Sequence, residues 1–248
     1  MFYSKLKIIL KKIPFINNFI LKLDNANERI DFIKKELLSL EKGLTILDAG
    51  CGSQMFKKYC THLIYKSQDF GQYANDEKQV MNDSKITSNE EKPSYKYGNI
   101  DYKGDIWNIE EKDDFFDVIL CTEVFEHIPY PIDTVKEFSR LLKKKGKLIL
   151  TTPSNCLRHF DPYFFYSGFS DRWFEKILPE NNLKVLSIIS VGEYYSWLGV
   201  EMARTAMSHS IFAKIILLPS FFYYFTKKKT TISTNTLCMG YFVVAEKI

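Results

Sequence analysis

The sequence predicts a single α/β domain built on a largely parallel sheet. Short apolar runs recur along the chain, and helical or polar segments separate them, as in βαβ crossovers. The first of these runs leads directly into a turn with two glycines, Gly50 and Gly52, which is typical of a strand that opens a nucleotide-binding unit. The chain has 248 residues, of which 46% are hydrophobic and 26% charged, so it can bury a substantial core. This composition excludes disordered, collagen-like and disulfide-framework proteins.

The first predicted element is a helix over residues 25–42, because Ile30, Ile33, Leu37 and Leu40 share one apolar face. We expect an N-terminal helical extension over residues 1–42. The main domain then covers residues 43–248, and its acceptor-side or lid segments lie at about 154–182 and 194–230. Strands are predicted over these ranges: 44–47, 62–67, 99–102, 116–121, 147–152, 183–191 and 239–246.

Three connections complete the predicted order of elements. A new helix is expected directly after the glycine turn. The polar residues 74–97 indicate a loop. A further helix is predicted over 131–144, since Pro131 suits a first turn, the lysines 143–145 complement the dipole at the last turn, and Gly146 then ends the helix.

Charge and cysteine content limit the partners and the compartment. The net charge of +4 is too small to indicate a nucleic-acid partner. No CxxC pair is present, which argues against a disulfide framework and a zinc site and favours a cytoplasmic location. The five cysteines are Cys51, Cys60, Cys121, Cys156 and Cys238.

Two apolar segments that carry lysines, residues 3–23 and 211–229, are too interrupted or too short to be predicted as transmembrane helices. Each segment is interpreted either as a helix packed on the domain or a dimer contact, or as a peripheral contact with the inner membrane surface. For residues 211–225 we slightly favour packing on the domain or a dimer contact.

Two acidic positions suit parts of a nucleoside. Asp69 follows the second strand and could accept hydrogen bonds from both hydroxyls of a ribose, although an Asp at this place also caps turns. Asp105 stands beside Ile106, a pair that suits the amino group and one face of an adenine ring. A dinucleotide is disfavoured because Met55 occupies the position of the third glycine of the GxGxxG pattern.

Five segments in this order resemble the class I S-adenosylmethionine-dependent methyltransferases: LDAGCGS at 47–53, Asp69, GDI at 104–106, FDVILCTEVFEHIPYP at 116–131 and FSRLLKKKGKLILTTP at 138–153. The chain is most similar to small bacterial methyltransferases associated with surface-polysaccharide biosynthesis. The resemblance implies a Rossmann-like, seven-stranded, mostly parallel sheet with order 3-2-1-4-5-7-6, flanked by helices. It also implies S-adenosylmethionine as the cofactor.

The resemblance implies a role for each cofactor-binding position. The glycine turn would pass beneath the amino-acid part of the cofactor, and Asp48 would organise that turn and help to hold the ammonium group. The carbonyl of Cys121 would face the methionine moiety. The implied set is Asp48, Gly50, Gly52, Asp69, Asp105, Ile106 and Cys121. Two departures from the family pattern, Ser53-Gln54 and Lys144-Lys145, remove none of these contacts.

Two histidines are candidate general bases. His127 follows the fourth strand and His159 follows the fifth, with Asp161 nearby. Imidazole is the usual base near neutral pH, although a histidine beside a pocket is often only a hydrogen-bonding wall residue.

A metal site is the second interpretation of the same region. Glu123, Glu126 and His127 have the E-x-x-E-H spacing that binds a divalent metal in ubiquinone-biosynthesis O-methyltransferases. They could hold Mg²⁺ beside an acceptor hydroxyl. Because related enzymes carry this segment without a metal, we favour a protein without one, in which Glu126 and His127 brace the next helix.

Aromatic residues follow the fifth strand and suit either stacking of a sugar or packing of a lid: Phe160, Tyr163, Phe164, Phe165, Tyr166, Phe169, Trp173 and Phe174. Glu201 and Arg204, at helical spacing, are either a surface pair or part of the same site. The predicted reaction is O-methylation of a saccharide or related cell-envelope precursor. The alternatives are an amine or phosphate-type acceptor, metal-assisted methylation of a small aromatic or quinone-like acceptor, a nicotinamide-dependent oxidoreductase, and a non-catalytic membrane-associated protein.

Overall fold

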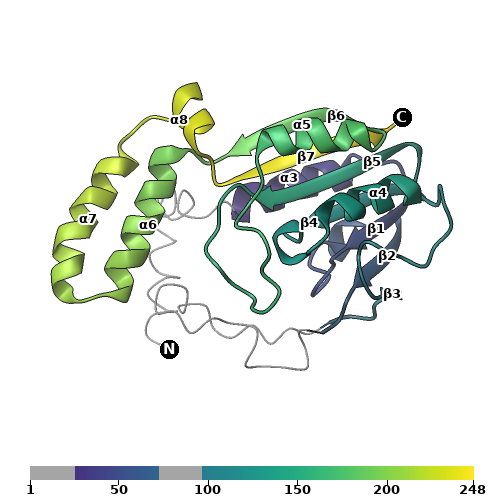
Figure 1. Ribbon diagram of the computed structural model, residues 1–248, viewed down its shortest axis with the longest axis horizontal. Coiled ribbons are helices and arrows are strands. Elements are labelled where there is room, and N and C mark those ends of the chain that lie inside the picture. Colours follow the sequence, from purple (N-terminus) through teal and green to yellow (C-terminus); the bar gives the residue numbers. More distant parts are fainter. Residues whose placement is uncertain (1–25, 73–96) are drawn as a thin grey trace. The chain divides into compact units, whose positions relative to one another are not determined.

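A computed structural model describes residues 26–72 and 97–248, which fall into two compact units. The larger unit is formed by residues 31–189 and 240–248 and contains nearly the whole sheet (Figure 1). The smaller unit contains residues 190–239 and the start of the first described helix. The two units are described separately below. The segment 3–23 and nearly all of the predicted loop 74–97 lie outside the described residues.

The sheet has seven strands in the order β3-β2-β1-β4-β5-β7-β6, which confirms the predicted order. β1 pairs in parallel with β2 and with β4, β4 pairs in parallel with β5, and β7 runs antiparallel to β5. The strands are β1 (Thr45–Ala49), β2 (Ile64–Asp69), β3 (Tyr102–Lys103), β4 (Phe116–Thr122), β5 (Leu142–Pro153), β6 (Leu183–Val191) and β7 (Gly240–Lys247).

Helices flank this sheet in the larger unit. Phe32 of α3 stacks on Phe242 of β7 with ring centroids 4.8 Å apart, and α4 contributes Val135 and Phe138 to the fully buried core. The larger unit contains most of α3 (Ala26–Leu38), α4 (Pro131–Leu141) and α5 (Asp171–Glu180), with short 3₁₀ turns η1 (Lys57–Tyr59) and η3 (Phe125–His127). The smaller unit contains α6 (Tyr194–Ser208), α7 (Ile211–Phe225) and α8 (Thr231–Thr236). Among the described residues, no helix combines the length and hydropathy that crossing a bilayer would require.

Two of the predicted connections are wrong. No α-helix follows the glycine turn, where only η1 forms after a series of turns. α4 ends at Leu141 instead of Lys144, and β5 begins at once with Leu142, which pairs with Phe116. Both leucines are fully buried, and Lys143 bonds to the Asp117 carboxylate at 2.8 Å. Pairing with β4 therefore outweighs the favourable interaction of the lysines with a helix C-terminus.

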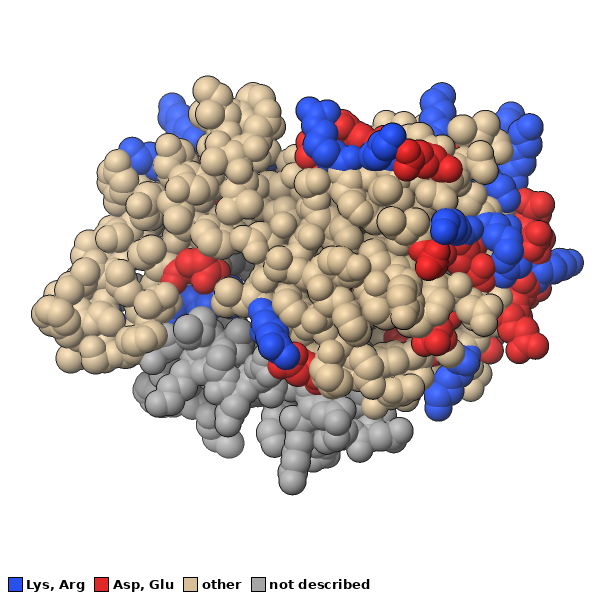
Figure 2. Space-filling model, viewed as in Figure 1, with Lys and Arg blue, Asp and Glu red and all other residues tan. Residues whose placement is uncertain are grey.

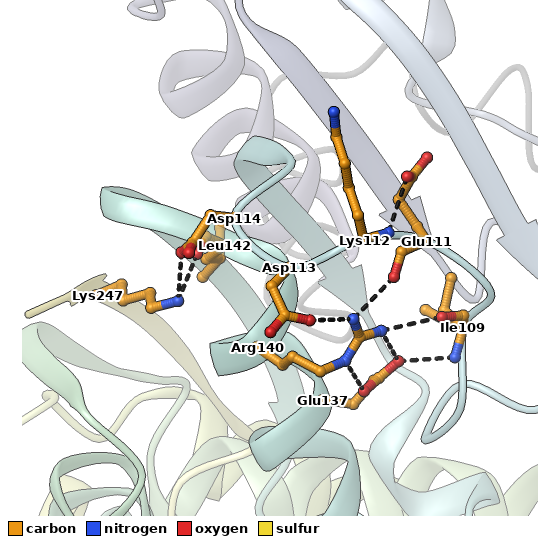
Figure 3. Close-up of polar contacts among 9 residues, drawn as sticks. All are labelled: Ile109, Glu111, Lys112, Asp113, Asp114, Glu137, Arg140, Leu142 and Lys247. Atoms are coloured by element: carbon orange, nitrogen blue, oxygen red, sulfur yellow. Dashed lines mark hydrogen bonds and ion pairs between the residues drawn. The ribbon is translucent and has the colours of Figure 1, made fainter.

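One guanidinium group fastens the loop before β4 to α4 (Figure 3). Arg140 donates to both carboxylate oxygens of Glu137, to the Asp113 carboxylate and to the carbonyl oxygens of Ile109 and Glu111, at 2.7–3.0 Å. Glu137 is almost buried and also accepts the N–H of Ile109 at 2.7 Å. These bonds hold the loop in one position relative to the helix.

We expect Arg140→Ala to lower the free energy of unfolding by about 2–3 kcal/mol, because it removes several charge-assisted hydrogen bonds and leaves nearly buried Glu137 without its cation. The measurement is urea unfolding followed by circular dichroism. Lys136→Ala is the matched control on the same helix, since its exposed ion pair with Asp133 contributes only about 0–1 kcal/mol. Equal losses in the two variants would contradict the assignment.

Candidate cofactor and acceptor site

The candidate site lies where four parallel strands end. β1, β2, β4 and β5 run in the same direction, so Ala49, Asp69, Thr122 and Pro153 lie at the same edge of the sheet. Ligands of open α/β sheets bind outside the carboxyl ends of the strands. The sequence-predicted residues of the glycine turn, the second strand and η3 all belong to this edge.

The glycine turn approaches the backbone and side chains around it closely. Gly50 has a φ of +72°, and a Cβ placed on it would lie 2.4 Å from a methyl carbon of Val124, just after β4. Its N–H bonds to the carbonyl oxygen of Gln68 at 2.9 Å and to the side-chain oxygen of Gln68 at 3.1 Å. Only glycine fits this position.

Asp69 organises the end of β2. Its two carboxylate oxygens accept the N–H groups of Gly52 and Gly71, each at 2.9 Å. The side chain is almost buried, and this burial raises the pKa of Asp69. The Tyr97 side chain and the Phe70 N–H also stabilise the ionised carboxylate. A ribose hydroxyl would therefore share this acceptor with donors of the chain itself.

Asp48 is held from the neighbouring strand. The Tyr65 hydroxyl donates to its carboxylate at 2.6 Å. Burial, opposed by this hydrogen bond and assisted by the charge of Asp69, raises the pKa of Asp48 to about 6. An ammonium group placed beside the glycine turn would stabilise the ionised form of this buried carboxyl.

Two residues of the site were not predicted from the sequence, Tyr65 and Gln68. Besides binding Gly50, the Gln68 amide donates to the Gly104 carbonyl at 2.7 Å and so joins the loops after β1 and β3. An amide or a phenol within a short strand gives no signal of its own in a single sequence. The only available signal for Gln68 is its place directly before Asp69.

The other implied cofactor residues lie as follows. The Asp105 side chain is exposed, and its carbonyl accepts the N–H of Asn108 at 3.2 Å. Ile106 is only 4% exposed and packs in the hydrophobic core. Cys121 is fully buried near the end of β4, where burial raises the pKa of its thiol well above the usual range. Its thiol is therefore protonated and unreactive.

The fold brings the two candidate histidines together. The rings of His127, on η3, and His159, after β5, meet edge to face with centroids 4.7 Å apart. The Nδ1 atom of His127 lies 2.7 Å from the Tyr163 carbonyl, and that of His159 lies 2.8 Å from the Leu157 carbonyl. A carbonyl only accepts, so the hydrogen-bond geometry assigns the proton to Nδ1 in each neutral ring and leaves Nε2 with a lone pair.

His127 is neutral at physiological pH. Burial, reinforced by the neighbouring charge of His159, lowers the pKa of His127 to about 4 even though the Tyr163 carbonyl favours the protonated ring. Asp161 lies near His159 in the sequence but pairs with Arg158 at 2.7 Å. A neutral imidazole with a free Nε2 can accept a proton or bind a metal ion.

The possible metal ligands differ from the set that the sequence suggested. Within residues 26–72 and 97–248, one ligand atom each from Glu126, His127 and His159 lies within 4.8 Å of the other two. Glu123 is not part of this group. Glu126 is almost fully buried, and its carboxylate lies 3.6 Å from Nε2 of His127. Two imidazoles held by carbonyls at Nδ1, together with one carboxylate, fit a divalent cation.

The aromatic segment divides into two parts. Phe169, Trp173 and Phe174 pack in or against the core, so this half has a structural role. Phe160 and Phe164 instead lie beside the histidines: the Phe160 ring is centred 5.3 Å from that of His127, and the Phe164 ring 5.4 Å from that of His159. On the same segment Phe165 and Tyr166 are among the exposed large side chains. This half provides apolar ring faces next to the two imidazoles.

Glu201 and Arg204 lie on α6 in the smaller unit. Their side chains form an ion pair of 3.4 Å within the helix, at i,i+3 spacing. Both side chains are partly buried.

Comparisons with known proteins agree with this geometry. A family model described as a methyltransferase domain matches residues 23–198. A ubiquinone biosynthesis O-methyltransferase from Coxiella burnetii is 26% identical over 172 residues, which cover 68% of this chain and 66% of that relative, slightly less than two thirds of its length. One from Xanthomonas oryzae is 30% identical over 83 residues, 34% of this chain and 33% of the relative.

Solved structures share the fold at low identity. A geranyl diphosphate methyltransferase in complex with S-adenosylmethionine has a TM-score of 0.53 and 14% identity, covering 89% of this chain and 85% of its own. The [4+2]-cyclase SpnF has a TM-score of 0.53 and 16% identity, covering 90% and 81%. A methyltransferase structure from Bacillus halodurans has a TM-score of 0.50 and 16% identity, covering 86% and 96%.

Proposed function

Because the chain belongs to the class I S-adenosylmethionine-dependent methyltransferases, we propose that it methylates a hydroxyl group and that His127 accepts the hydroxyl proton. One observation carries this proposal. His127 is a partly buried, neutral imidazole, 12% exposed, whose Nδ1 is fixed by a backbone carbonyl, and it follows β4 at the same edge of the sheet from which the glycine turn begins. Methylation of a hydroxyl requires a group that accepts its proton, whereas a neutral amine can attack the methyl group without one.

Different residues serve the cofactor and the acceptor. When bound, S-adenosylmethionine supplies a methyl group on a sulfonium sulfur. The glycine turn lets the backbone lie against the amino-acid part, and Asp69 accepts the ribose hydroxyls. His127 would orient the acceptor hydroxyl through Nε2 and take its proton as the carbon–oxygen bond forms and the carbon–sulfur bond breaks, which releases S-adenosylhomocysteine. A weak base suffices, because the hydroxyl becomes strongly acidic as its oxygen gives electrons to the methyl carbon.

We propose a saccharide-type acceptor of a cell-envelope precursor. Sugars stack the apolar faces of their C–H bonds on aromatic rings, and Phe160 and Phe164 offer such rings beside the histidines. The Tyr163 hydroxyl donates to the Gln72 side chain at 2.8 Å, which connects this segment to the loop after β2. This arrangement can hold a polyhydroxylated ring with one hydroxyl directed at Nε2 of His127.

The test is transfer of a radiolabelled methyl group from S-adenosylmethionine to a panel of nucleotide-linked and lipid-linked saccharides, with catechols and amines as comparison acceptors. We expect label in an alkali-stable ether on a saccharide. Label only on amines, or only on catechols, would overturn the saccharide proposal.

A second candidate is metal-assisted methylation of a small aromatic or quinone-like acceptor. The cluster of Glu126, His127 and His159 favours it, as does the similarity to ubiquinone biosynthesis O-methyltransferases. In this candidate Nε2 of His127 binds the metal and cannot act as base. Chelation with EDTA separates the two: the metal-free proposal expects unchanged kcat, whereas loss of activity that Mg²⁺, Mn²⁺ or Zn²⁺ restores would support this second candidate.

A further inference from the structure

One face of α7 carries large apolar side chains that no other described part of the chain covers. Six of them are between 52% and 71% exposed: Ile211, Phe212, Ile215, Ile216, Phe222 and Tyr223. At 100° per residue these positions fall within an arc of about 140° on one side of the helix. We call this set the α7 stripe. It is continuous along the helix, because exposed Pro219 lies between its two halves.

The opposite side of α7 packs within the smaller unit. Phe221 is 4% exposed and lies against Gly199 of α6, where a Cβ on the glycine would be 3.6 Å from the phenylalanine ring. The rings of Tyr195 and Tyr224 stack at 6.3 Å. Packing on the domain, one of the two arrangements that the sequence slightly favoured, therefore describes only one side of the helix. The stripe is directed away from α6.

The chain around the stripe carries basic residues and no acidic ones. No Asp or Glu occurs between residues 202 and 245, and the basic residues there are Arg204, Lys214, Lys227, Lys228 and Lys229. Lys227 lies 4.2 Å from the ring centroid of Tyr223, so the lysine cluster begins directly at the end of the stripe. Lys228 and Lys229 are exposed. Figure 2 shows the α7 surface in this view with almost no charged residues.

We propose that the α7 stripe and the lysines 227–229 dock on the surface of a bilayer that contains anionic lipid. An apolar helix face flanked by lysines lies in the interfacial plane, with its apolar side chains among the acyl chains and the lysines on the lipid phosphates. A second copy of the chain is a poorer occupant, because this segment offers no carboxylate for the lysines of either copy. The proposal does not depend on the identity of the methyl acceptor.

The experiment is flotation of the purified full-length protein with phosphatidylglycerol–phosphatidylcholine vesicles and with neutral phosphatidylcholine vesicles. We expect binding to the anionic vesicles that weakens with added salt. Phe212→Ser/Ile215→Ser/Phe222→Ser should reduce the partition coefficient at least tenfold. Lys227→Gln/Lys228→Gln/Lys229→Gln should reduce it about 100-fold on anionic vesicles, at roughly fivefold for each lysine near the surface.

The matched control is Leu186→Ser/Ile189→Ser, which removes similarly exposed apolar side chains from β6. The control should bind like the unmodified protein, and all variants should keep their circular dichroism spectra and their affinity for S-adenosylhomocysteine. Absence of binding to anionic vesicles would overturn the proposal, as would equal losses in the control and stripe variants. So would a dimer in light scattering that the stripe substitutions abolish while vesicle binding persists.

Discussion

Replacing His127 by glutamine is expected to lower kcat by about 100- to 10,000-fold, the range for loss of a positioned proton acceptor. Glutamine is close to the imidazole in size and its amide approximates the position of Nε2, but it cannot accept a proton at neutral pH. Binding of S-adenosylmethionine should change little, since His127 contributes nothing to the glycine turn. The measurement is single-turnover methyl transfer with saturating cofactor, paired with calorimetry of cofactor binding.

The pH dependence gives an independent readout of the same group. A base acts in its neutral form, so activity falls when the pH drops through its pKa. With S-adenosylmethionine saturating, so that protonation of Asp48 does not limit cofactor binding, kcat/KM for the acceptor should stay level from pH 8 to about 5, because the pKa of His127 is near 4; an imidazole of ordinary pKa would lose activity near 6.5.

His159→Gln is the matched variant, since it keeps the neighbouring shape but removes the charge that helps to lower the pKa of His127. In this variant the fall of kcat/KM at acidic pH should begin at a higher pH, while kcat at pH 8 falls less than tenfold. If His159→Gln lost far more activity than His127→Gln at pH 8, His159 would be the base and the assignment to His127 would be wrong.

Removing the Asp69 carboxylate is expected to weaken binding of S-adenosylmethionine about 100-fold, because two charge-assisted hydrogen bonds to the ribose are lost. Asp69→Ala also leaves the N–H groups of Gly52 and Gly71 without their acceptor, so the free energy of unfolding should fall by about 2 kcal/mol. Calorimetric titration with S-adenosylhomocysteine and thermal unfolding measure the two effects separately.

Asp101→Ala is the control for the structural part of this loss. The Asp101 carboxylate accepts the Ser67 N–H and hydroxyl, each at 2.9 Å, so the variant also breaks bonds to β2 but touches no proposed ribose position. We expect it to lose stability while keeping its affinity for the cofactor. Comparable losses of affinity in the two variants would show that Asp69 acts only by supporting the loop.

Much of the sheet and the outline of the site could be predicted from the sequence. The apolar runs and the glycine turn indicate the strands, because strand burial and positive φ restrict which residues can stand there. The order of the strands in the sheet comes from the resemblance to the class I methyltransferases. His127 and His159 were both predicted as candidates, but their edge-to-face contact was not. That contact depends on how residues 154–170 fold back onto η3, where the N–H groups of Phe165 and Tyr166 bond to the Glu126 carbonyl.

The residues that the sequence placed wrongly, and those that it missed, depend on contacts between distant parts of the chain. The lysines 143–145 favour the end of a helix locally, but pairing of Leu142 with Phe116 and the Lys143–Asp117 bond are long-range and place them in a strand. Tyr65 and Gln68 act through side chains that reach a neighbouring strand or loop. A single sequence contains no information on which side chains face each other across strands, and so these two residues could not be predicted.

The direct passage from α4 into β5 restricts how the length of this chain can vary. Leu141 closes the helix, Leu142 opens the strand, and both side chains are fully buried, so there is no connecting residue to absorb an added or deleted one. One inserted residue would reverse which side chains of the early strand face the core. In a library of random insertions and deletions, functional clones should therefore be strongly depleted at this junction.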